Sequence, residues 1–433
     1  MNERETLKNN CGLLEIGGIS CTALKEKFGT PLYVMDKAYI KNMCKVFSQT
    51  LQSEYGDGLI CYASKAFSCK EIYRIINEVG IGADSVSMGE LYTAKSVNFP
   101  MNKICLHGNN KTYEELCFAV DCGVKYVVID SYSEADTLNE ICAKKGVKQN
   151  VLIRVNPGVE AHTHHFIQTA KIDSKFGFSI ASGEAEQIVL HVSGYDNLVL
   201  DGLHCHIGSQ IFEEKSFSLA VEKMTNFYKV LKDKYGIEFN ALNLGGGFGI
   251  WYADGDAKKT YIEYADYIRI ISKTLINALN EKGLKKPYLI LEPGRSIVGE
   301  AGITLYTAGS IKTIKDVKNY VAIDGGMFDN PRFALYQAKY SVVAAEKLNE
   351  KPKVKYTIAG KCCESGDIIA EDVILPEIKK GDLIAVLSTG AYNYSMSSNY
   401  NRNLIPPVVM VEDGKAYYAI KPQTYEDLLR NDV

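Results

Sequence analysis

The sequence ALNLGGGFG (241–249) joins a short apolar run to a glycine-rich turn. The run has the length of a buried strand, and the glycines offer backbone N–H groups with no side chains in the way. The next such run, YLILEPGR (288–295), ends in an arginine that suits a phosphate or carboxylate. Loops after strands seven and eight of a TIM barrel commonly bind a phosphate. The two runs therefore predict a phosphate cup formed by Gly245, Gly246, Gly247, Gly294 and Arg295.

Six more apolar, β-branched runs lie upstream of these two. Segments such as Ser216–Tyr235 and Tyr261–Lys282 separate the runs and have apolar residues at three- and four-residue spacing. This alternation predicts parallel strands joined by crossover helices, which a TIM (β/α)8 barrel and an open doubly wound sheet share. The polar residues at the strand ends favour the barrel. The eight expected strands are Leu59–Ser64, Gly82–Ser87, Lys103–Gly108, Tyr126–Asp130, Val151–Asn156, Leu200–Ile207, Ala241–Gly246 and Tyr288–Glu292.

The pattern changes after about residue 300. Runs such as GITLYTAGSIKTI (302–314) and DLIAVL (382–387) are short and strand-like, and turn residues separate them. They predict an all-β C-terminal domain of sandwich or barrel-like form. A chain of 433 residues also exceeds the usual size of one domain. We therefore expect a barrel over residues 34–300, and a β domain made of residues 1–33 plus 301–433.

The bulk composition excludes several classes of partner. The net charge is -3, with acidic and basic residues interspersed, so we expect no nucleic acid partner. The polar start MNERETLKNN resembles no signal peptide, and no apolar run has the length to span a bilayer. These features predict a soluble cytoplasmic protein. Twelve cysteines without any C-x-x-C pair are expected to be mostly reduced core thiols.

Lys65 follows the apolar run ICYA at the end of the first expected strand, so its amine would point into the mouth of the barrel. A solvated loop lysine is the plain alternative. Beside a phosphate cup, however, a desolvated lysine can lose its proton and form a Schiff base with an aldehyde. Lysine and phosphate cup together predict pyridoxal 5'-phosphate. Glu292 ends strand eight, where it either caps a turn, pairs with Arg295, or keeps the pyridine nitrogen of that cofactor protonated.

The segment HCHIGSQ (204–210) ends the sixth expected strand. Strand alternation predicts that His204 and His206 share one face. Such a pair can supply two zinc ligands, but an imidazole can equally stack on a cofactor ring. The other histidine cluster, HTHH (162–165), lies in a different loop, and no cysteine spacing supports a metal site. We therefore expect no metal.

The ordered set of motifs resembles the fold-type III pyridoxal-phosphate-dependent decarboxylases, and within them the diaminopimelate decarboxylases. The resemblance runs nearly end to end, and the CESGD segment and the HTH…DSKFGF loop point to this subfamily. The motifs are YASKAF (62–67), GADSVSMGEL (82–91), HGNNK (107–111), HTHHFIQT (162–169), DSKFGF (173–178), HCHIGSQ (204–210), GGGFG (245–249), EPGR (292–295), DGGMFDNPRFALY (324–336), CESGD (363–367) and GAYNYSMSSNY (390–400).

The resemblance implies roles for residues at the cofactor. Lys65 would hold pyridoxal phosphate, His206 would stack on its ring, and Glu292 would pair with the pyridine nitrogen. The phosphate or the substrate end would be held by Ser209, the Gly245–Gly247 loop and Arg295. Tyr392 would touch both cofactor and substrate.

The resemblance also implies a homodimer whose two active sites each borrow residues from the partner. Arg332 and Tyr336 would contact the substrate carboxylate, Glu364 the distal amino group, and Cys363 would donate a proton across the dimer. By themselves, Arg332 is as readily a surface ion-pair residue and Cys363 a buried core thiol beside Cys362.

The implied reaction is decarboxylation of meso-2,6-diaminopimelate to L-lysine and carbon dioxide, the last step of lysine biosynthesis. Holding the far carboxylate and ammonium of this substrate requires partners such as arginine and glutamate. A decarboxylase for carboxynorspermidine, arginine or a D-amino acid, or an inactive regulatory homologue, are the alternatives. Fine substrate choice is affected by departures from the usual family residues at Phe67, Phe333, Tyr340, Ser85 and Asn403.

Overall fold

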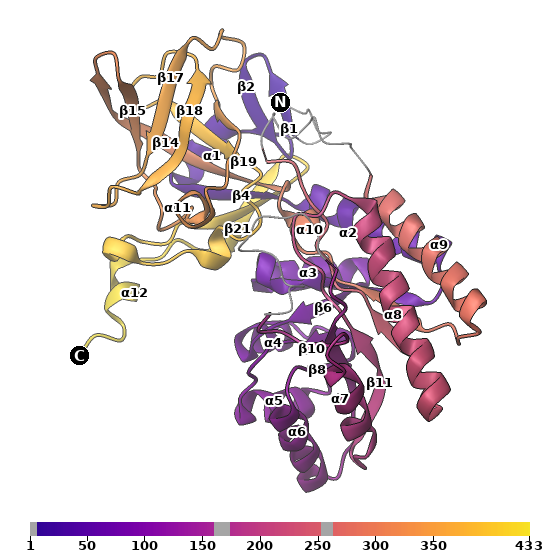
Figure 1. Cartoon of the computed structure of the whole chain (residues 1–433). Helices are drawn as coiled ribbons and strands as arrows, with labels where there is room; N and C mark the ends of the chain where they lie inside the picture. The colour runs from indigo at the N-terminus through magenta and orange to yellow at the C-terminus, as the bar shows by residue number, and fades with distance from the viewer. Residues whose placement is uncertain (1–6, 160–173, 253–262) are drawn as a thin grey trace. The chain divides into compact units, whose positions relative to one another are not determined.

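The computed structural model describes residues 7–159, 174–252 and 263–433 (Figure 1). The chain divides into two compact units, which are described separately. One unit contains Met43–Gly249 and Thr260–Gly294 and is called the barrel unit below. The other, called the β unit, contains Met1–Asn42, Ile250–Lys259 and Arg295–Val433. The predicted domain limits at residues 34 and 300 remain predictions.

The barrel unit contains a closed ring of eight parallel strands, which confirms the predicted TIM barrel. Each strand pairs with the next along the chain, and the last pairs with the first, with Leu289 opposite Gly58 and Leu291 opposite Ile60. A short extra strand, β10 (Phe178–Ser179), pairs with the fifth strand of the ring. The ring consists of β5 (Gly58–Ala63), β6 (Gly82–Ser85), β7 (Ile104–Leu106), β8 (Tyr126–Ile129), β9 (Gln149–Asn156), β11 (Leu198–His204), β12 (Ala241–Asn243) and β13 (Tyr288–Leu291).

Helices of the barrel unit begin and end at capping residues. The helix at Tyr113–Cys122 starts with a capping box, in which Thr112 and Glu115 bond each other's backbone N–H, and it ends at Gly123 in the left-handed region. The segment predicted as helical from Ser216 is the longest helix. The helices are α2 (Lys37–Glu54), which begins in the β unit, α3 (Lys70–Val79), α4 (Met88–Lys95), α5 (Tyr113–Cys122), α6 (Tyr132–Lys145), α7 (Glu184–Ser193), α8 (Glu214–Tyr235) and α9 (Tyr264–Lys282).

The register of the ring gathers the polar motifs at one rim. Parallel pairing aligns the carboxyl ends of neighbouring strands, for example Ser85 with Leu106 and His204 with Asn243. The motifs that carry Lys65, His107 and Glu292 all follow directly after a strand. These side chains therefore belong to the end of the barrel where TIM-barrel enzymes carry their chemistry.

The β unit is built on a nine-stranded sheet with the main order β18-β17-β15-β14-β4-β20-β21. Its N-terminal strand β4 (Leu32–Asp36) lies between β14 and β20, antiparallel to the first and parallel to the second. The other strands are β14 (Gly302–Ile314), β15 (Lys318–Ile323), β16 (Val342–Ala344), β17 (Val354–Ala359), β18 (Ile368–Leu375), β19 (Leu383–Leu387), β20 (Val408–Glu412) and β21 (Lys415–Ile420), with a separate sheet of β1 (Leu7–Asn10), β2 (Leu13–Ile16) and β3 (Ile19–Ser20). The helices are α1 (Cys21–Phe28), α10 (Arg295–Val298), α11 (Arg332–Tyr336) and α12 (Tyr425–Leu429).

None of the twelve cysteines, all of which lie in described segments, forms a disulfide. In the described part of the chain, no helix is long and apolar enough to cross a membrane. The buried cysteines are Cys21, Cys44, Cys61, Cys69, Cys105, Cys142 and Cys205.

Asp329 is a buried carboxylate in the loop that leads to α11. Its side chain accepts hydrogen bonds from the Tyr306 hydroxyl and, at 3.1 Å, from the Gly326 N–H. Burial raises the pKa of Asp329 to about 8, and the neighbouring Asp367 and Asp324 carboxylates add to the rise. This side chain is therefore neutral near pH 7, and its hydrogen bonds fix the loop before Arg332.

We expect Asp329→Asn to remove a pH dependence from the stability of the protein. Folded Asp329 keeps its proton up to about pH 8, whereas an unfolded aspartate loses it near about pH 4. The folded state therefore holds one extra proton between these values, and stability falls as pH rises. From roughly pH 5 to 7, the free energy of unfolding should fall by about 1.4 kcal/mol per pH unit relative to the asparagine variant. Chemical denaturation at several pH values compares the two slopes, and equal slopes would contradict the assignment.

Candidate active site

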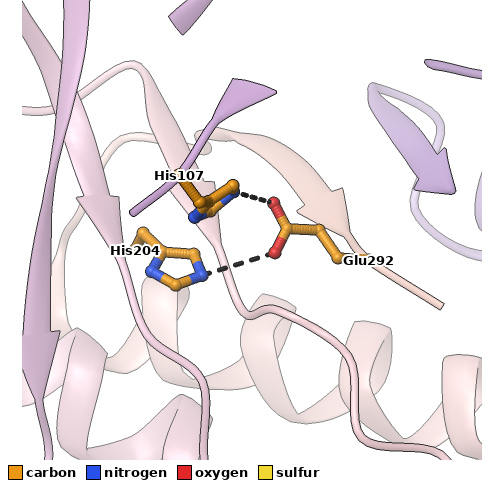
Figure 2. Close-up of side chains that lie close together, drawn as sticks. All are labelled: His107, His204 and Glu292. Atoms are coloured by element: carbon orange, nitrogen blue, oxygen red, sulfur yellow. Dashed lines mark hydrogen bonds and ion pairs between the residues drawn. The ribbon is translucent and has the colours of Figure 1, made fainter. Parts of the chain in front are cut away.

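Glu292 is the centre of a buried polar cluster at the rim of the barrel unit (Figure 2). Its Oε1 lies 2.8 Å from His107 Nε2 and accepts a 2.6 Å hydrogen bond from the Asn243 side-chain amide. Its Oε2 lies 3.4 Å from His204 Nε2. The rings of His107 and His204 meet edge to face with their centres 4.7 Å apart. Three strand ends thus converge on one carboxylate.

The surroundings of Glu292 keep it ionised. Burial alone would raise its pKa, but the charge and hydrogen bond of His107, together with His204, hold the pKa well below its usual range. Burial lowers the pKa of His204 to about 3, so this imidazole is neutral. Burial also raises the pKa of Asp84, whose Oδ1 lies 3.7 Å from His107 Nε2. The two buried carboxyl groups that flank His107 therefore have pKa values shifted in opposite directions.

His107 and Asn243 received no role from the sequence, although both are central to this cluster. His107 lies in the quoted HGNNK motif directly after β7, and Asn243 is the last residue of β12. Their position at the carboxyl end of a barrel strand is the feature of the sequence that points to a place in the site. The sequence pattern does not predict which rim side chains point toward the same carboxylate, so it assigns neither residue to the site.

His107, His204 and Glu292 each offer one possible metal-ligand atom, and these three atoms lie within 4.8 Å of one another. These are ligand types that zinc accepts. Oε1 of Glu292, however, is already engaged by two donors. The absence of a metal remains a prediction.

The glycine turn after β12 is held from both sides. The N–H of Gly245 donates to the Asn243 side-chain oxygen at 2.9 Å, and the N–H of Gly246 donates to His206 Nδ1 at 3.3 Å. In the described part of the chain, the N–H of Gly247 has no acceptor. Of these three N–H groups, that of Gly247 is the uncommitted one, and the role of the turn as a phosphate cup stays a prediction.

His206 is half-buried, and burial lowers its pKa well below the usual range, with the nearby Lys65 adding to the effect. Strand β11 ends at His204, two residues earlier. The alternation that predicted a shared face for the two histidines therefore does not extend to His206. His204 turns to Glu292, whereas His206 contacts the glycine turn.

We expect Gly246→Ala to weaken cofactor binding by at least about tenfold. A Cβ at this position would lie 2.0 Å from the backbone oxygen of Glu292, so the turn must move. Gly194→Ala is the matched control, since its Cβ would meet its nearest neighbour, the His191 oxygen, at 3.4 Å. Fluorescence titration of the cofactor-free protein with pyridoxal phosphate measures both affinities. Unchanged affinity in Gly246→Ala would contradict a role for the turn.

Lys65 lies in a short 3-10 turn, Ser64–Ala66, directly after β5. Burial raises the pKa of Asp84 and of Glu90 and lowers that of His206; the charge of Lys65 opposes the two rises and adds to the fall, so its amine belongs to the polar residues of the rim. The side chain is exposed in the structure. The loss of a proton from Lys65 beside a bound cofactor stays a prediction.

Two other predicted cofactor residues of the barrel unit occupy the same rim. Gly294 follows β13, and a Cβ there would lie 2.8 Å from the Ala63 side chain, so a larger residue would collide with the end of β5. Ser209 is half-buried in the loop after β11. The HTHH cluster at 162–165 falls outside the described residues.

In the β unit, two buried arginines lie among aromatic rings. Arg295 donates to the Tyr252 hydroxyl, and its guanidinium carbon lies 4.6 Å from the Tyr392 ring centre. The guanidinium carbon of Arg332 lies 5.4 Å from the Tyr336 ring centre and 5.7 Å from that of Tyr392. Arg332 is 8% exposed, so the alternative of a surface ion-pair residue is excluded. Cation–π contacts hold both guanidinium groups in place.

Cys363 and Glu364 are exposed, and the loop that carries them is anchored by Asp367. The buried Asp367 carboxylate accepts the Cys362 N–H at 2.7 Å and the Met327 N–H at 2.6 Å. The Cys363 N–H donates to the Asn401 side chain at 2.8 Å. The alternative of a buried core thiol is therefore excluded for Cys363.

The departures from the family pattern are mostly core residues. Tyr340 is buried, and its ring centre lies 5.0 Å from that of Tyr252, within the arginine and tyrosine cluster. Asn403 donates to the Cys362 sulfur at 3.7 Å. Phe67, Ser85 and Phe333 are also buried.

The family model "Pyridoxal-dependent decarboxylase, pyridoxal binding domain" matches residues 38–299. A diaminopimelate decarboxylase from Halalkalibacterium halodurans is 46% identical over 425 residues, which cover 98% of this chain and 96% of that protein. The Bacillus subtilis diaminopimelate decarboxylase is 47% identical over 426 residues, with the same coverage of both chains.

Solved structures of diaminopimelate decarboxylases are similar to this chain over nearly its full length. The diaminopimelate decarboxylase of M. jannaschii matches with a TM-score of 0.91 at 35% identity, covering 99% of this chain and 98% of that one. That of Helicobacter pylori, complexed with L-lysine, matches with a TM-score of 0.85 at 30% identity, covering 94% and 98%. The barrel, its rim and the family match define a pyridoxal-dependent decarboxylase. With relatives this similar over nearly its full length, the chain belongs to the diaminopimelate decarboxylase family of carboxy-lyases.

Proposed function

We propose that this chain decarboxylates meso-2,6-diaminopimelate to L-lysine and carbon dioxide, the last step of lysine biosynthesis. The observation that carries the proposal is the ionised Glu292, which two donors hold at the same rim that carries Lys65. The family relatives support the substrate, since those reported above are diaminopimelate decarboxylases and one was solved with L-lysine.

The rim residues of the barrel unit fit pyridoxal 5'-phosphate. A side chain at Gly246 would collide with the Glu292 backbone, so a glycine lets the turn pack against the end of β13. The Gly247 N–H is open to a phosphate oxygen. When bound, the cofactor supplies an electron sink for the electron pair left by the departing carboxyl group. The protein supplies binding, orientation and proton transfer.

Each residue at the cofactor has a proposed task. Lys65 supplies the primary amine that holds the cofactor's aldehyde carbon, and Glu292 holds a proton on its ring nitrogen. His206 packs against the ring. Ser209, the Gly247 N–H and Arg295 bind the phosphate, with Arg295 also available to the substrate. Gly245, Gly246 and Gly294 shape the cup around it.

The β unit is proposed to recognise the far end of the substrate. Arg332 is buried and held by rings, so it can offer a fixed guanidinium to the distal carboxylate. Glu364 would bind the distal ammonium, because a carboxylate is its natural partner. Tyr336 and Tyr392, which flank Arg332, would complete this subsite.

Cys363 is proposed to give its Sγ proton to the substrate carbon that has lost carbon dioxide. Its exposure supports delivery to a partner's site, so we propose a cytoplasmic homodimer with shared active sites. Within each chain, the segment 34–300 would be the cofactor-binding barrel, and the segments 1–33 and 301–433 would be the β domain whose C-terminal part lends Cys363 to the partner's site.

A panel of substrates tests the choice of diaminopimelate. We expect kcat/KM for meso-diaminopimelate to exceed that for carboxynorspermidine, arginine and D-amino acids by at least about 100-fold, since only the first fills both distal partners. Carbon dioxide release measures each rate. A higher kcat/KM for any other member of the panel would overturn the proposed substrate, and no turnover of any member would favour a regulatory homologue.

A further inference from the structure

The two oxygens of Glu292 have unequal surroundings. Oε1 is engaged by two donors, His107 Nε2 at 2.8 Å and the Asn243 amide at 2.6 Å. Oε2 has a longer contact, with His204 Nε2 at 3.4 Å. Figure 2 shows the carboxylate turned with one oxygen toward each histidine. Oε2 therefore carries the weaker contact and keeps capacity for a further hydrogen bond.

The orientation of the Asn243 amide is fixed by a second contact. Its side-chain oxygen accepts the Gly245 N–H at 2.9 Å, so its nitrogen must point to Glu292. Asn243 is completely buried. One side chain thus couples the glycine turn to the carboxylate.

His107 is fixed equally well. Its backbone N–H donates to the Ser85 oxygen at 2.8 Å, its ring packs edge to face on His204, and the side chain is 6% exposed. The Nε2 atom lies 2.8 Å from Glu292 and 3.7 Å from Asp84, so its proton has a carboxylate acceptor in this tautomer. The ring cannot turn away from Glu292 without losing these contacts.

We propose that His107 is a positioning residue for Glu292, which together with Asn243 occupies Oε1 and leaves Oε2 as the acceptor for the protonated ring nitrogen of pyridoxal phosphate. This inference rests on the proposed function, because it assumes that Glu292 faces the cofactor. Hydrogen bonds to an ionised carboxylate stabilise its charge. Without the His107 donor, Oε1 keeps only the Asn243 amide, so Glu292 becomes a stronger base and takes the proton from the ring nitrogen.

The test uses His107→Phe, which fills the space but removes the donor, and His107→Gln, whose longer amide restores one. Each variant is loaded with pyridoxal phosphate labelled with nitrogen-15 in the ring, and the chemical shift of that nitrogen is recorded by NMR. We expect His107→Phe to move the shift toward the unprotonated value and to lower kcat about 10- to 100-fold, the effect of one hydrogen bond to a charged group. KM should change less than kcat, and His107→Gln should recover both readouts.

A purely structural role for His107 would lower thermal stability without moving the nitrogen shift of the loaded protein. That result, or a wild-type shift and a kcat within twofold in His107→Phe, would overturn the inference. Should His107→Phe not fold, His107→Asn serves in its place, since its shorter amide cannot reach Oε1. Glu292→Gln separates the two claims: if it keeps wild-type kcat, the proposed role of Glu292 fails as well, whereas its inactivity beside an active His107→Phe removes only the inference.

Discussion

Lys65→Ala is expected to lower kcat at least about 1,000-fold, since the variant lacks the Lys65 amine that would hold the cofactor's aldehyde. The variant should also lose the absorbance of the covalently held cofactor, and borohydride should no longer fix pyridoxal phosphate to the chain. Folding should be unaffected, because the Lys65 side chain is exposed. Spectra, borohydride trapping and steady-state kinetics measure the three effects.

Lys70→Ala is the matched control for this experiment. Lys70 is another exposed lysine, five residues further on, at the start of α3. Its replacement should leave the spectrum and the rate unchanged. Wild-type activity in Lys65→Ala would rule out the assignment of Lys65.

Cys363→Ala is expected to lower kcat about 100- to 10,000-fold while the cofactor absorbance stays as in the wild type. The thiol is exposed, so its loss should not change the unfolding temperature. The separation of a normal spectrum from a low rate is the signature of a proton donor that acts after the cofactor has bound. Cys11→Ala is the control, since Cys11 is the other exposed cysteine. A rate within threefold of the wild type in Cys363→Ala would exclude the proposed donor.

A mixture of the Lys65→Ala and Cys363→Ala chains tests the shared site. After unfolding and refolding together in equal amounts, half of the dimers would be mixed, and each mixed dimer would have one intact site and one doubly altered site. About a quarter of wild-type activity should therefore return. Activity no higher than the average of the two separate variants would show that each chain uses its own cysteine.

The barrel could be predicted because its strands are local, apolar and separated by helical period. Each of the eight expected strands corresponds to an observed one, and the polar ends mark the rim correctly. The position of β4 in its sheet was harder to predict from the sequence. It lies between β14, about 270 residues away in sequence, and β20, about 375 residues away. The apolar residues of β4 do not indicate such distant partners.

The candidate site was predictable in type but not in detail. Lys65 and Glu292 could be selected because each directly follows a strand and carries chemistry that a cofactor needs. His107 and Asn243 were not selected, since the direction in which a rim side chain turns depends on packing across several strands. The glycine turn was predicted as a phosphate cup, and in the structure two of its N–H groups bond to Asn243 and His206. Composition alone does not predict these hydrogen bonds within the turn.

The most direct test of the central claim is the product balance with meso-diaminopimelate. The purified chain, loaded with pyridoxal phosphate, is incubated with meso-diaminopimelate, and carbon dioxide and L-lysine are quantified together. We expect the two products in a one-to-one ratio, and neither from the Lys65→Ala chain. Carbon dioxide without L-lysine, or no product from a fully loaded wild-type chain, would contradict the proposed function.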